Sequence, residues 1–304
     1  MQTIEIVEVG PRDGLQNEAV SFSTAQKLAF IERALDFGVR RIEATSFVNP
    51  KLVPQMADAD AVAAGLQRRP GVIYIGLALN KRGALRAMEA GLDEVGAVCA
   101  ASDSFAQRNQ GQSSDESLQM CCEVVRLAQQ HGRRAQITIS TAFGCPFDGE
   151  VDPGRVVEMA RIAAACNPLE IAIADTIGVA APRDVADLVT RVREAIQPLP
   201  LRVHFHNTRN TGLANVWAAV TAGAMTVDAS LGGLGGCPFA PRATGNVPTE
   251  DVVYMLERSG YHTGLKLDDL IAAAQWLTTQ MARELPGMLS RAGNFPPIES
   301  RGNV

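Results

Sequence analysis

Two histidines stand two positions apart near the end of one apolar, β-branched segment. Residues i and i+2 of a β-strand point to the same face, so His204 and His206 would present both imidazoles to one site. Two imidazoles, a carboxylate and an amide oxygen make a mixed nitrogen and oxygen site, which suits a divalent cation such as Mg²⁺ or Mn²⁺. A pair of hydrogen-bonded core histidines is the alternative for this spacing taken by itself.

A carboxylate and a guanidinium follow the first apolar segment of the chain. Asp13 can complete the cation site, and its presence favours a metal over a core histidine pair. Arg12, beside it, could donate hydrogen bonds to an oxyanion that develops near the metal. Arg12 could also form an ion pair with Glu43 or Asp175, which stand at the ends of two other expected strands. We expect these two carboxylates to position Arg12 and the metal ligands rather than to react.

Cys237 lies in a glycine-rich segment. Four of the five residues at 232–236 are glycines, and Pro238 follows the cysteine. Glycines let a loop close over a site, and a thiol carried by such a loop could deliver a proton once the loop closes. A single cysteine is more often inert. Cys145, which precedes Pro146, is a second loop cysteine that the residues alone do not exclude as the acid.

Short apolar segments alternate with longer segments of helical period along the chain. The expected strands are Ile4–Val9, Arg40–Ala44, Val72–Leu77, Glu94–Val98, Ala135–Ser140, Glu170–Ala174, Leu201–Phe205 and Thr226–Ser230. The expected helices are Ser23–Phe37, Gln55–Gln67, Lys81–Ala90, Ser113–His131, Asp152–Cys166, Pro182–Ile196, Thr211–Ala222, Pro248–Ser259 and Leu267–Glu284.

Eight strands, each followed by a helix, indicate a (β/α)8 TIM barrel. A doubly wound sheet is the alternative, but its GxGxxG fingerprint is missing after the first strand. We predict one domain over residues 1–304, with the barrel at about 1–259 and a C-terminal helical extension at about 260–304. Function in such a barrel lies at the C-terminal ends of the strands. This rule places at the mouth Arg12, Asp13, Gln16, Glu43, Asp175, Thr176, His204, His206, Cys237 and Asn246.

Composition places the chain among globular proteins. Its 304 residues are 46% hydrophobic and 20% charged, with a formal net charge of -5, which excludes a disordered chain and gives no sequence-wide footprint for nucleic acid. No uncharged apolar run reaches the length of a membrane span, and no signal or transit pattern opens the chain. Six cysteines without a CxxC motif predict reduced thiols in a cytoplasmic protein.

Motifs along nearly the whole chain resemble those of the hydroxymethylglutaryl-CoA lyase family, one of the metal-dependent lyase and synthase barrels. They lie at Glu8–Glu18, Thr45–Val48, Val53–Met56, Gly144–Phe147, Ala174–Val179, Gly233–Pro241, Gly245–Val247 and Thr249–Leu256. The glycine-rich motif around Cys237 is the most specific of them.

The resemblance implies a metal centre and a set of catalytic groups around it. The ligands of the divalent metal would be Asp13, His204, His206 and Asn246. Arg12 would polarise the thioester oxygen and stabilise the enolate, and Cys237 would protonate the acetyl-CoA carbanion. His204 would also transfer a proton at the substrate hydroxyl. Support would come from Glu43 and Asp175, with Gln16 near the substrate, where we also expect Arg12 and Thr176.

The expected function is therefore a lyase that cleaves a 3-hydroxy-3-methylglutaryl-CoA-like thioester to acetyl-CoA and a keto acid, acetoacetate. Its rivals are a lyase for another 3-hydroxyacyl-CoA (citramalyl-CoA-like or longer branched), a Claisen-type synthase, and a non-catalytic metabolite-binding barrel. The C-terminal extension is too short for the regulatory domain that such synthases usually carry, and a pure binder needs no loop thiol. The expected partner is an acyl-CoA substrate, with no nucleic acid, no membrane and a possible homodimer.

The departures of the chain from the family pattern include Phe239, where Tyr is usual, and two cations. Arg209 stands in His204–Asn210, where the family usually reads His-x-His-Asp-Thr-Tyr-Gly, and Arg242 stands where small residues are usual. Either arginine could read an acyl carboxylate or the phosphates of CoA, and either could simply be solvated. These departures leave the exact acyl group open.

Overall fold

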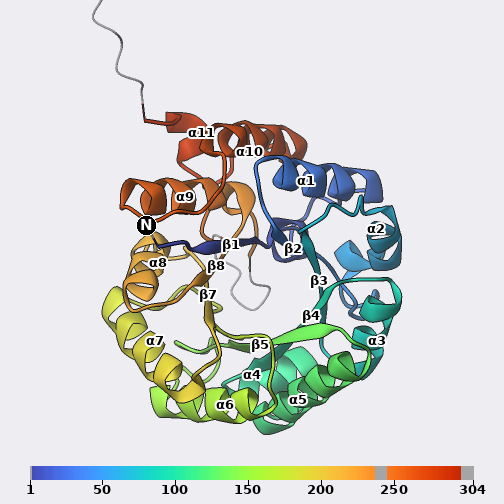
Figure 1. Cartoon of the computed structure of the whole chain (residues 1–304), viewed down its shortest axis with the longest axis vertical. Helices are drawn as coiled ribbons and strands as arrows, with labels where there is room; N and C mark the ends of the chain where they lie inside the picture. The colour runs from blue at the N-terminus through green and yellow to red at the C-terminus, as the bar shows by residue number, and fades with distance from the viewer. Residues whose placement is uncertain (1, 237–244, 296–304) are drawn as a thin grey trace, which may run out of the picture.

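Eight parallel strands close into a barrel in the computed structural model, which describes residues 2–236 and 245–295 (Figure 1). The strands are β1 (Glu5–Glu8), β2 (Arg41–Ser46), β3 (Ile73–Ala78), β4 (Glu94–Ala100), β5 (Arg134–Ser140), β6 (Ile171–Asp175), β7 (Leu201–Phe205) and β8 (Thr226–Ala229). Each strand pairs with the next along the chain, and β8 closes the ring against β1, with Val227 opposite Ile6. The expected (β/α)8 barrel is confirmed.

Helices surround the ring of strands (Figure 1). They are α1 (Thr24–Asp36), α2 (Ala59–Gly65), α3 (Lys81–Glu89), α4 (Asp103–Gln110), α5 (Ser114–Gln130), α6 (Pro153–Ala165), α7 (Pro182–Ile196), α8 (Gly212–Thr221), α9 (Thr249–Arg258), α10 (Leu267–Met281) and α11 (Leu289–Ala292). Their buried apolar faces and the strands share one large hydrophobic core. This core fixes the strand ends that carry the polar residues.

Helix ends follow the local chemistry of the sequence. The Ser113 side chain accepts the N–H of Glu116, whose carboxylate accepts the N–H of Ser113 in return, so α5 begins with a capping box. Asp152 caps α6, with Pro153 at the first helical position. Gly38 stops α1 at a φ of 111°, which glycine adopts without strain. Such signals explain why most element bounds are predictable to within a few residues.

Two segments differ from the expectation. The helix expected over Gln55–Gln67 is divided into a 3-10 turn at Pro54–Met56 and the shorter α2. No sequence pattern predicts α4, because only Phe105 and Ala106 are buried in it and two apolar residues make no helical period.

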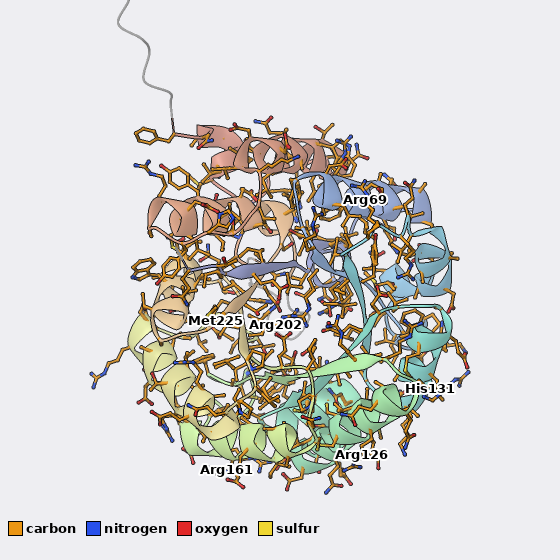
Figure 2. All side chains as sticks on the ribbon, viewed as in Figure 1. Arg69, Arg126, His131, Arg161, Arg202 and Met225 are labelled. Carbon is orange, nitrogen blue, oxygen red and sulfur yellow. A yellow bond between two sulfur atoms is a disulfide. The ribbon has the colours of Figure 1, made fainter. Side chains whose placement is uncertain are left out.

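Alternating charges fill the centre of the barrel. Arg41 pairs with Glu94 and, at 2.6 Å, with Glu170, and Glu170 in turn lies 3.4 Å from Arg202. The Nε of Arg202 donates to Asp228. All five side chains are almost fully buried, and Figure 2 shows Arg202 within the ring of strands. Every charge in this row has an opposite partner, which burial of an ion requires.

The helix expected over Leu267–Glu284 is α10. It packs on α1 and α9 and on a 3-10 turn, Leu231–Gly233, that follows β8. In Figure 1, α10 and α11 lie outside α1 and α9, away from the barrel centre. The C-terminal extension therefore lies beside the turn from which the glycine-rich loop starts.

Cys122 and Cys166 form a disulfide that joins α5 to the end of α6. The expectation of reduced thiols is wrong for this pair. Their 44-residue separation carries no signal, and only the packing of α5 on α6 brings the two Cα atoms to 5.5 Å. Cys99, Cys121 and Cys145 are free and buried. Within the described ranges, no helix is long and apolar enough to cross a membrane.

Candidate active site

A cavity of about 410 Å³ lies at the C-terminal ends of the strands. It is lined by the predicted site residues Arg12, Asp13, Gln16, Glu43, Thr176, His204 and His206. Two further predicted residues, Asp175 and Asn246, are almost fully buried. Side chains from distant parts of the sequence therefore lie together at one end of the barrel, as the strand-end rule predicts.

Asp13, His204 and His206 form a compact donor set. One ligand atom of each lies within 4.8 Å of the others, and the Nε2 atom of each histidine is 3.9 Å from Asp13 Oδ2. The i, i+2 spacing turns both rings to the same side, as predicted. Burial alone would raise the pKa of Asp13, but Arg12 and the two imidazoles hold it well below its ordinary value. Asp13 is therefore an anion that faces the ring nitrogens of both histidines.

Asn246 joins this set from the segment after the glycine-rich loop. Its Nδ2 donates to Asp13 Oδ2 at 2.9 Å and to the Leu234 carbonyl at 3.0 Å. Its Oδ1 and the Nδ1 of His206 are buried and have no hydrogen-bond partner among the described residues. Buried polar atoms are rarely left without partners, so an unused amide oxygen beside a carboxylate and two imidazoles fits a divalent cation. Gly235, at a φ of 128°, is required here because a Cβ would lie 2.6 Å from Asn246 Nδ2.

Arg12 lies in a short π-helix, Gly10–Gly14, directly after β1. Its Nη2 is 2.6 Å from Glu43 Oε2, and its Nη1 is 2.6 Å from Asp13 Oδ1. Burial alone would lower the pKa of Arg12, but Glu43 and Asp13 raise it. The guanidinium is thus a fixed cation at the cavity wall. For Glu43, burial raises the pKa, although the charge of Arg12 opposes this effect.

The Asp175 carboxylate is held by backbone N–H groups rather than by the ion pair with Arg12 that was considered for it. It accepts the backbone N–H groups of Val179 and Ala180, each at 3.0 Å. The ion pair considered between Arg12 and either carboxylate is made with Glu43. Burial raises the pKa of Asp175, while the two backbone donors lower it. Asp175 therefore fixes the loop between β6 and α7.

Besides Arg12, the two other predicted substrate contacts, Thr176 and Gln16, are held by hydrogen bonds at the cavity wall. Thr176 Oγ1 accepts the N–H of Thr141 at 2.7 Å. Gln16 Oε1 lies 3.5 Å from Ser46 Oγ, which can donate to it. Both side chains line the cavity.

The structure describes Arg209, one of the two cations that depart from the family pattern. The other cation, Arg242, and the loop cysteine Cys237 lie outside the described residues. Gly236, which directly precedes Cys237, lines the cavity, and its carbonyl accepts Asn17 Nδ2 at 2.9 Å. Arg209 does not line the cavity; its Nη1 donates to the carbonyls of Ile177 and Gly178 at 3.2 and 2.8 Å.

Comparison with known proteins decides the family. A family model described as HMGL-like matches residues 3–277. The chain belongs to the HMGL-like family. An (R)-citramalyl-CoA lyase of Chloroflexus aurantiacus is 42% identical, with 98% of this chain and 97% of the relative covered. The mitochondrial hydroxymethylglutaryl-CoA lyase of Homo sapiens is 40% identical, over 95% of this chain and 89% of its own.

A solved structure supports the same assignment. It is an HMG-CoA lyase from Acinetobacter baumannii in complex with coenzyme A and 3-methylmalate, with a TM-score of 0.92 and 40% identity over 98% of both chains. The resemblance to the hydroxymethylglutaryl-CoA lyases is thus confirmed. So is the enzyme class: this HMGL-like chain is a carbon–carbon lyase.

Asp228 is a residue of the HMGL-like site that sequence reasoning missed. It lies on β8 in register with His204 of β7, and its Oδ2 accepts His204 Nδ1 at 3.0 Å. Burial alone would lower the pKa of His204, but the hydrogen bond to Asp228 and the charge of Asp13 raise it. A signal was present in the sequence, because a lone acid in an apolar strand of a barrel needs a buried partner.

Proposed function

We propose that this chain cleaves a 3-hydroxy-3-methylglutaryl-CoA-like thioester to acetyl-CoA and acetoacetate. One observation carries the proposal: the paired Arg12 guanidinium lies beside the donor set of Asp13, His204, His206 and Asn246 at one cavity. Retro-Claisen cleavage requires a proton acceptor for the hydroxyl, a positive group for the enolate oxygen and an acid for the new carbanion. The cavity offers the first two from described residues.

Arg12 is the group that would meet the thioester oxygen. Glu43 and Asp13 fix its guanidinium with two ion pairs of 2.6 Å. A cation held in place before the reaction stabilises a developing enolate without having to reorient, and removal of one such donor typically slows a reaction by about 10²–10³. Glu43 is therefore proposed to act by positioning Arg12.

His204 is proposed both to bind the metal and to take part in proton transfer at the substrate hydroxyl. Its ring lies at the cavity wall, with Nδ1 bonded to Asp228 and Nε2 on the side of Asp13. A bound Mg²⁺ or Mn²⁺, held by Asp13, His204, His206 and Asn246, would acidify the substrate hydroxyl. Asp175 holds the loop that carries Thr176 and so keeps that wall in place.

Cys237 is the proposed acid that protonates the carbanion of acetyl-CoA. The support is its place in the chain: it follows Gly236, whose carbonyl is anchored by Asn17 at the cavity. The glycines before it let the loop approach the site closely. The closing thiol would then exclude water while it donates its proton.

The acyl group of the substrate is the finer part of the proposal. A citramalyl-CoA-like substrate, which would yield pyruvate, is the second candidate, because the Chloroflexus aurantiacus relative that is 42% identical carries that activity in its name. A synthase reaction or a non-catalytic barrel finds no support among these relatives, which are named as lyases.

A panel of thioesters tests the function. The protein is incubated with Mg²⁺ or Mn²⁺ and with 3-hydroxy-3-methylglutaryl-CoA, citramalyl-CoA or a longer 3-hydroxy-3-alkylglutaryl-CoA, and acetyl-CoA release is measured. We expect the highest kcat/KM with 3-hydroxy-3-methylglutaryl-CoA. Faster cleavage of citramalyl-CoA would establish the second candidate, and release of acetyl-CoA from none of them would refute the lyase proposal.

We also propose a cytoplasmic location and a homodimer for the enzyme. Sedimentation equilibrium of the purified protein tests the homodimer, because a dimer would have twice the 32.3 kDa mass of the chain.

A further inference from the structure

We propose that Asp228, held by Arg202, is the positioning residue that sets the tautomer and orientation of the His204 ring, so that its Nε2 binds the divalent cation of the site. This inference rests on the proposed lyase function, which makes His204 a ligand of the divalent cation. It assigns a role to two buried residues whose task neither the family motifs nor the strand-end rule identified.

The first observation is the bond between the two strands. His204 and Asp228 stand opposite each other in β7 and β8, and Asp228 Oδ2 lies 3.0 Å from His204 Nδ1. A carboxylate at Nδ1 keeps the proton of a neutral imidazole on that nitrogen. The lone pair then stays on Nε2, the nitrogen that lies 3.9 Å from Asp13 Oδ2.

The second observation is the contrast with the neighbouring ring. The Nδ1 atom of His206 is buried, and among the described residues it has no hydrogen-bond partner. The two histidines have the same Nε2 distance to Asp13, so their positions alone do not distinguish them. They differ in the partner of Nδ1, which is a carboxylate for His204 and is absent for His206 in the described part of the chain.

The third observation is the way Asp228 itself is fixed. Its other oxygen accepts Arg202 Nε, and Arg202 is held in turn by Glu170, which also pairs with Arg41. These partners are almost fully buried in the barrel centre. Buried, oppositely charged pairs have little freedom to rearrange, because any displacement would leave an unpaired charge. The orientation of the His204 ring is therefore set by the barrel core rather than by the loops above it.

Two measurements on the parent protein and one variant test the role. The Asp228→Asn variant keeps the shape but removes the negative charge, and its amide can donate to Nδ1. We expect its affinity for Co²⁺, measured by calorimetry, to fall by about 10–100-fold, with a similar loss in kcat and a smaller change in KM. In the parent loaded with Mg²⁺, a long-range ¹H–¹⁵N spectrum of labelled histidines should show His204 with its proton on Nδ1.

Asp251→Asn is the matched control. Asp251 is a buried acid that accepts the backbone N–H groups of Met288 and Leu289 and lies outside the charge row. It should bind Co²⁺ within about twofold of the parent, because it has no contact with either histidine in the described structure. Assignment of the His204 signal comes from its absence in His204→Gln.

A double-mutant cycle separates positioning from simple loss of stability. If Asp228 acts through the ring of His204, then Asp228→Asn should lower Co²⁺ affinity far less in a His204→Gln background than in the parent. Parent-like Co²⁺ binding by Asp228→Asn, an equal loss in both backgrounds, or a His204 proton found on Nε2 would overturn the proposal. The spectrum of the parent decides the matter even if the variant fails to fold. Failure of the lyase proposal would instead appear as intact metal binding with no thioester cleaved.

Discussion

Asn246 donates a hydrogen bond to Asp13 at 2.9 Å while its own Oδ1 has no partner among the described residues. The bond joins the π-helix after β1 to the segment that follows the glycine-rich loop. Leaving a buried oxygen without a hydrogen bond costs about 1–3 kcal/mol. A cation that binds this oxygen together with Asp13 removes that cost. The pair therefore links the cation site to both of these segments.

Metal removal is the first test of this arrangement. We expect exhaustive chelation to abolish cleavage and Mg²⁺ or Mn²⁺ to restore it, because the hydroxyl proton is lost readily only next to the cation. His206→Ala should lower metal affinity strongly, since it deletes one of the four donors. Metal content and rate are measured on the same samples. Full activity of the demetallated protein would falsify the assignment of the ligands.

The pH dependence of stability tests two buried carboxyl groups, Glu250 and Glu8, beside the 3-10 turn Leu231–Gly233. Burial raises the pKa of Glu250 to about 8 and that of Glu8 to about 7. Between the ordinary value of 4.5 and these values, the folded protein keeps protons that the unfolded chain releases. The stability that these groups contribute is therefore complete below about pH 4.5 and is lost as the pH rises to about 8. The loss is on the order of several kcal/mol.

Glu250→Gln isolates the effect. The neutral amide can still accept the N–H of Gly232, which Glu250 accepts at 3.0 Å, but it cannot ionise. The variant should gain thermal stability over the parent between pH 5 and pH 9, as measured by the difference in Tm at each pH. The exposed Glu89→Gln is the control and should show no such trend. A constant difference between Glu250→Gln and the parent at both pH values would contradict the prediction.

Part of the site could be predicted because its signals are local. His204 and His206 are two residues apart on one strand, and Asp13 follows another strand, so a rule about strand ends is enough to bring them together. Asp228 could not be found this way, because its role depends on the register between β7 and β8. A register across the barrel is set by packing of the whole core rather than by any short motif.

The disulfide shows the same limit for the fold. Cys122 lies inside α5 and Cys166 directly after α6, so their meeting depends on how two helices pack. Helical periodicity places the elements along the chain but leaves their rotation about their own axes to the tertiary structure. The absence of a CxxC motif therefore gave no information on this pair.

Reduction should destabilise the protein measurably. On the chain-entropy account, closing a loop of 44 residues lowers the entropy of the unfolded chain and so stabilises the folded protein by about 3–4 kcal/mol. We expect dithiothreitol to lower Tm, and thiol titration in denaturant to find two more thiols after reduction than before. Cys121→Ser, which alters the neighbouring free cysteine, should retain the response, whereas Cys166→Ser should lose it. Equal thiol counts before and after reduction would disprove the bond.

Arg209 gives a prediction about specificity. Its guanidinium donates to the carbonyls of Ile177 and Gly178, and it does not line the cavity. We therefore expect Arg209→Gln to leave KM within about twofold and to reduce stability by about 1 kcal/mol, the worth of a typical hydrogen bond. Arg242→Gln should instead raise KM with little change in kcat if that residue reads a substrate anion. A marked rise in KM for Arg209→Gln would instead show that Arg209 contacts an anionic group of the substrate.

Cys237 is the residue that most separates a lyase from a simple binder. Cys237→Ser should keep the metal and the substrate affinity but lose turnover. The serine hydroxyl is small enough to preserve the loop, but its pKa lies far above that of a thiol, so it is a poor acid at neutral pH. Loss of a positioned acid typically slows a reaction by about 10²–10⁴, or roughly 3–5 kcal/mol in the barrier. The measurements are kcat, KM and metal content of the purified variant.

Cys145→Ser is the matched control for the acid. Cys145 is buried, and its sulfur lies 2.9 Å from the hydroxyl of Ser102 and 3.4 Å from the backbone nitrogens of Phe147 and Asp148. It is not among the residues that line the cavity. Because its sulfur is held by these hydrogen bonds and does not line the cavity, Cys145→Ser should turn over at close to the parent rate. If Cys237→Ser instead matches the parent while Cys145→Ser fails with its metal retained, the acid is misassigned and the glycine-rich loop acts only as a lid.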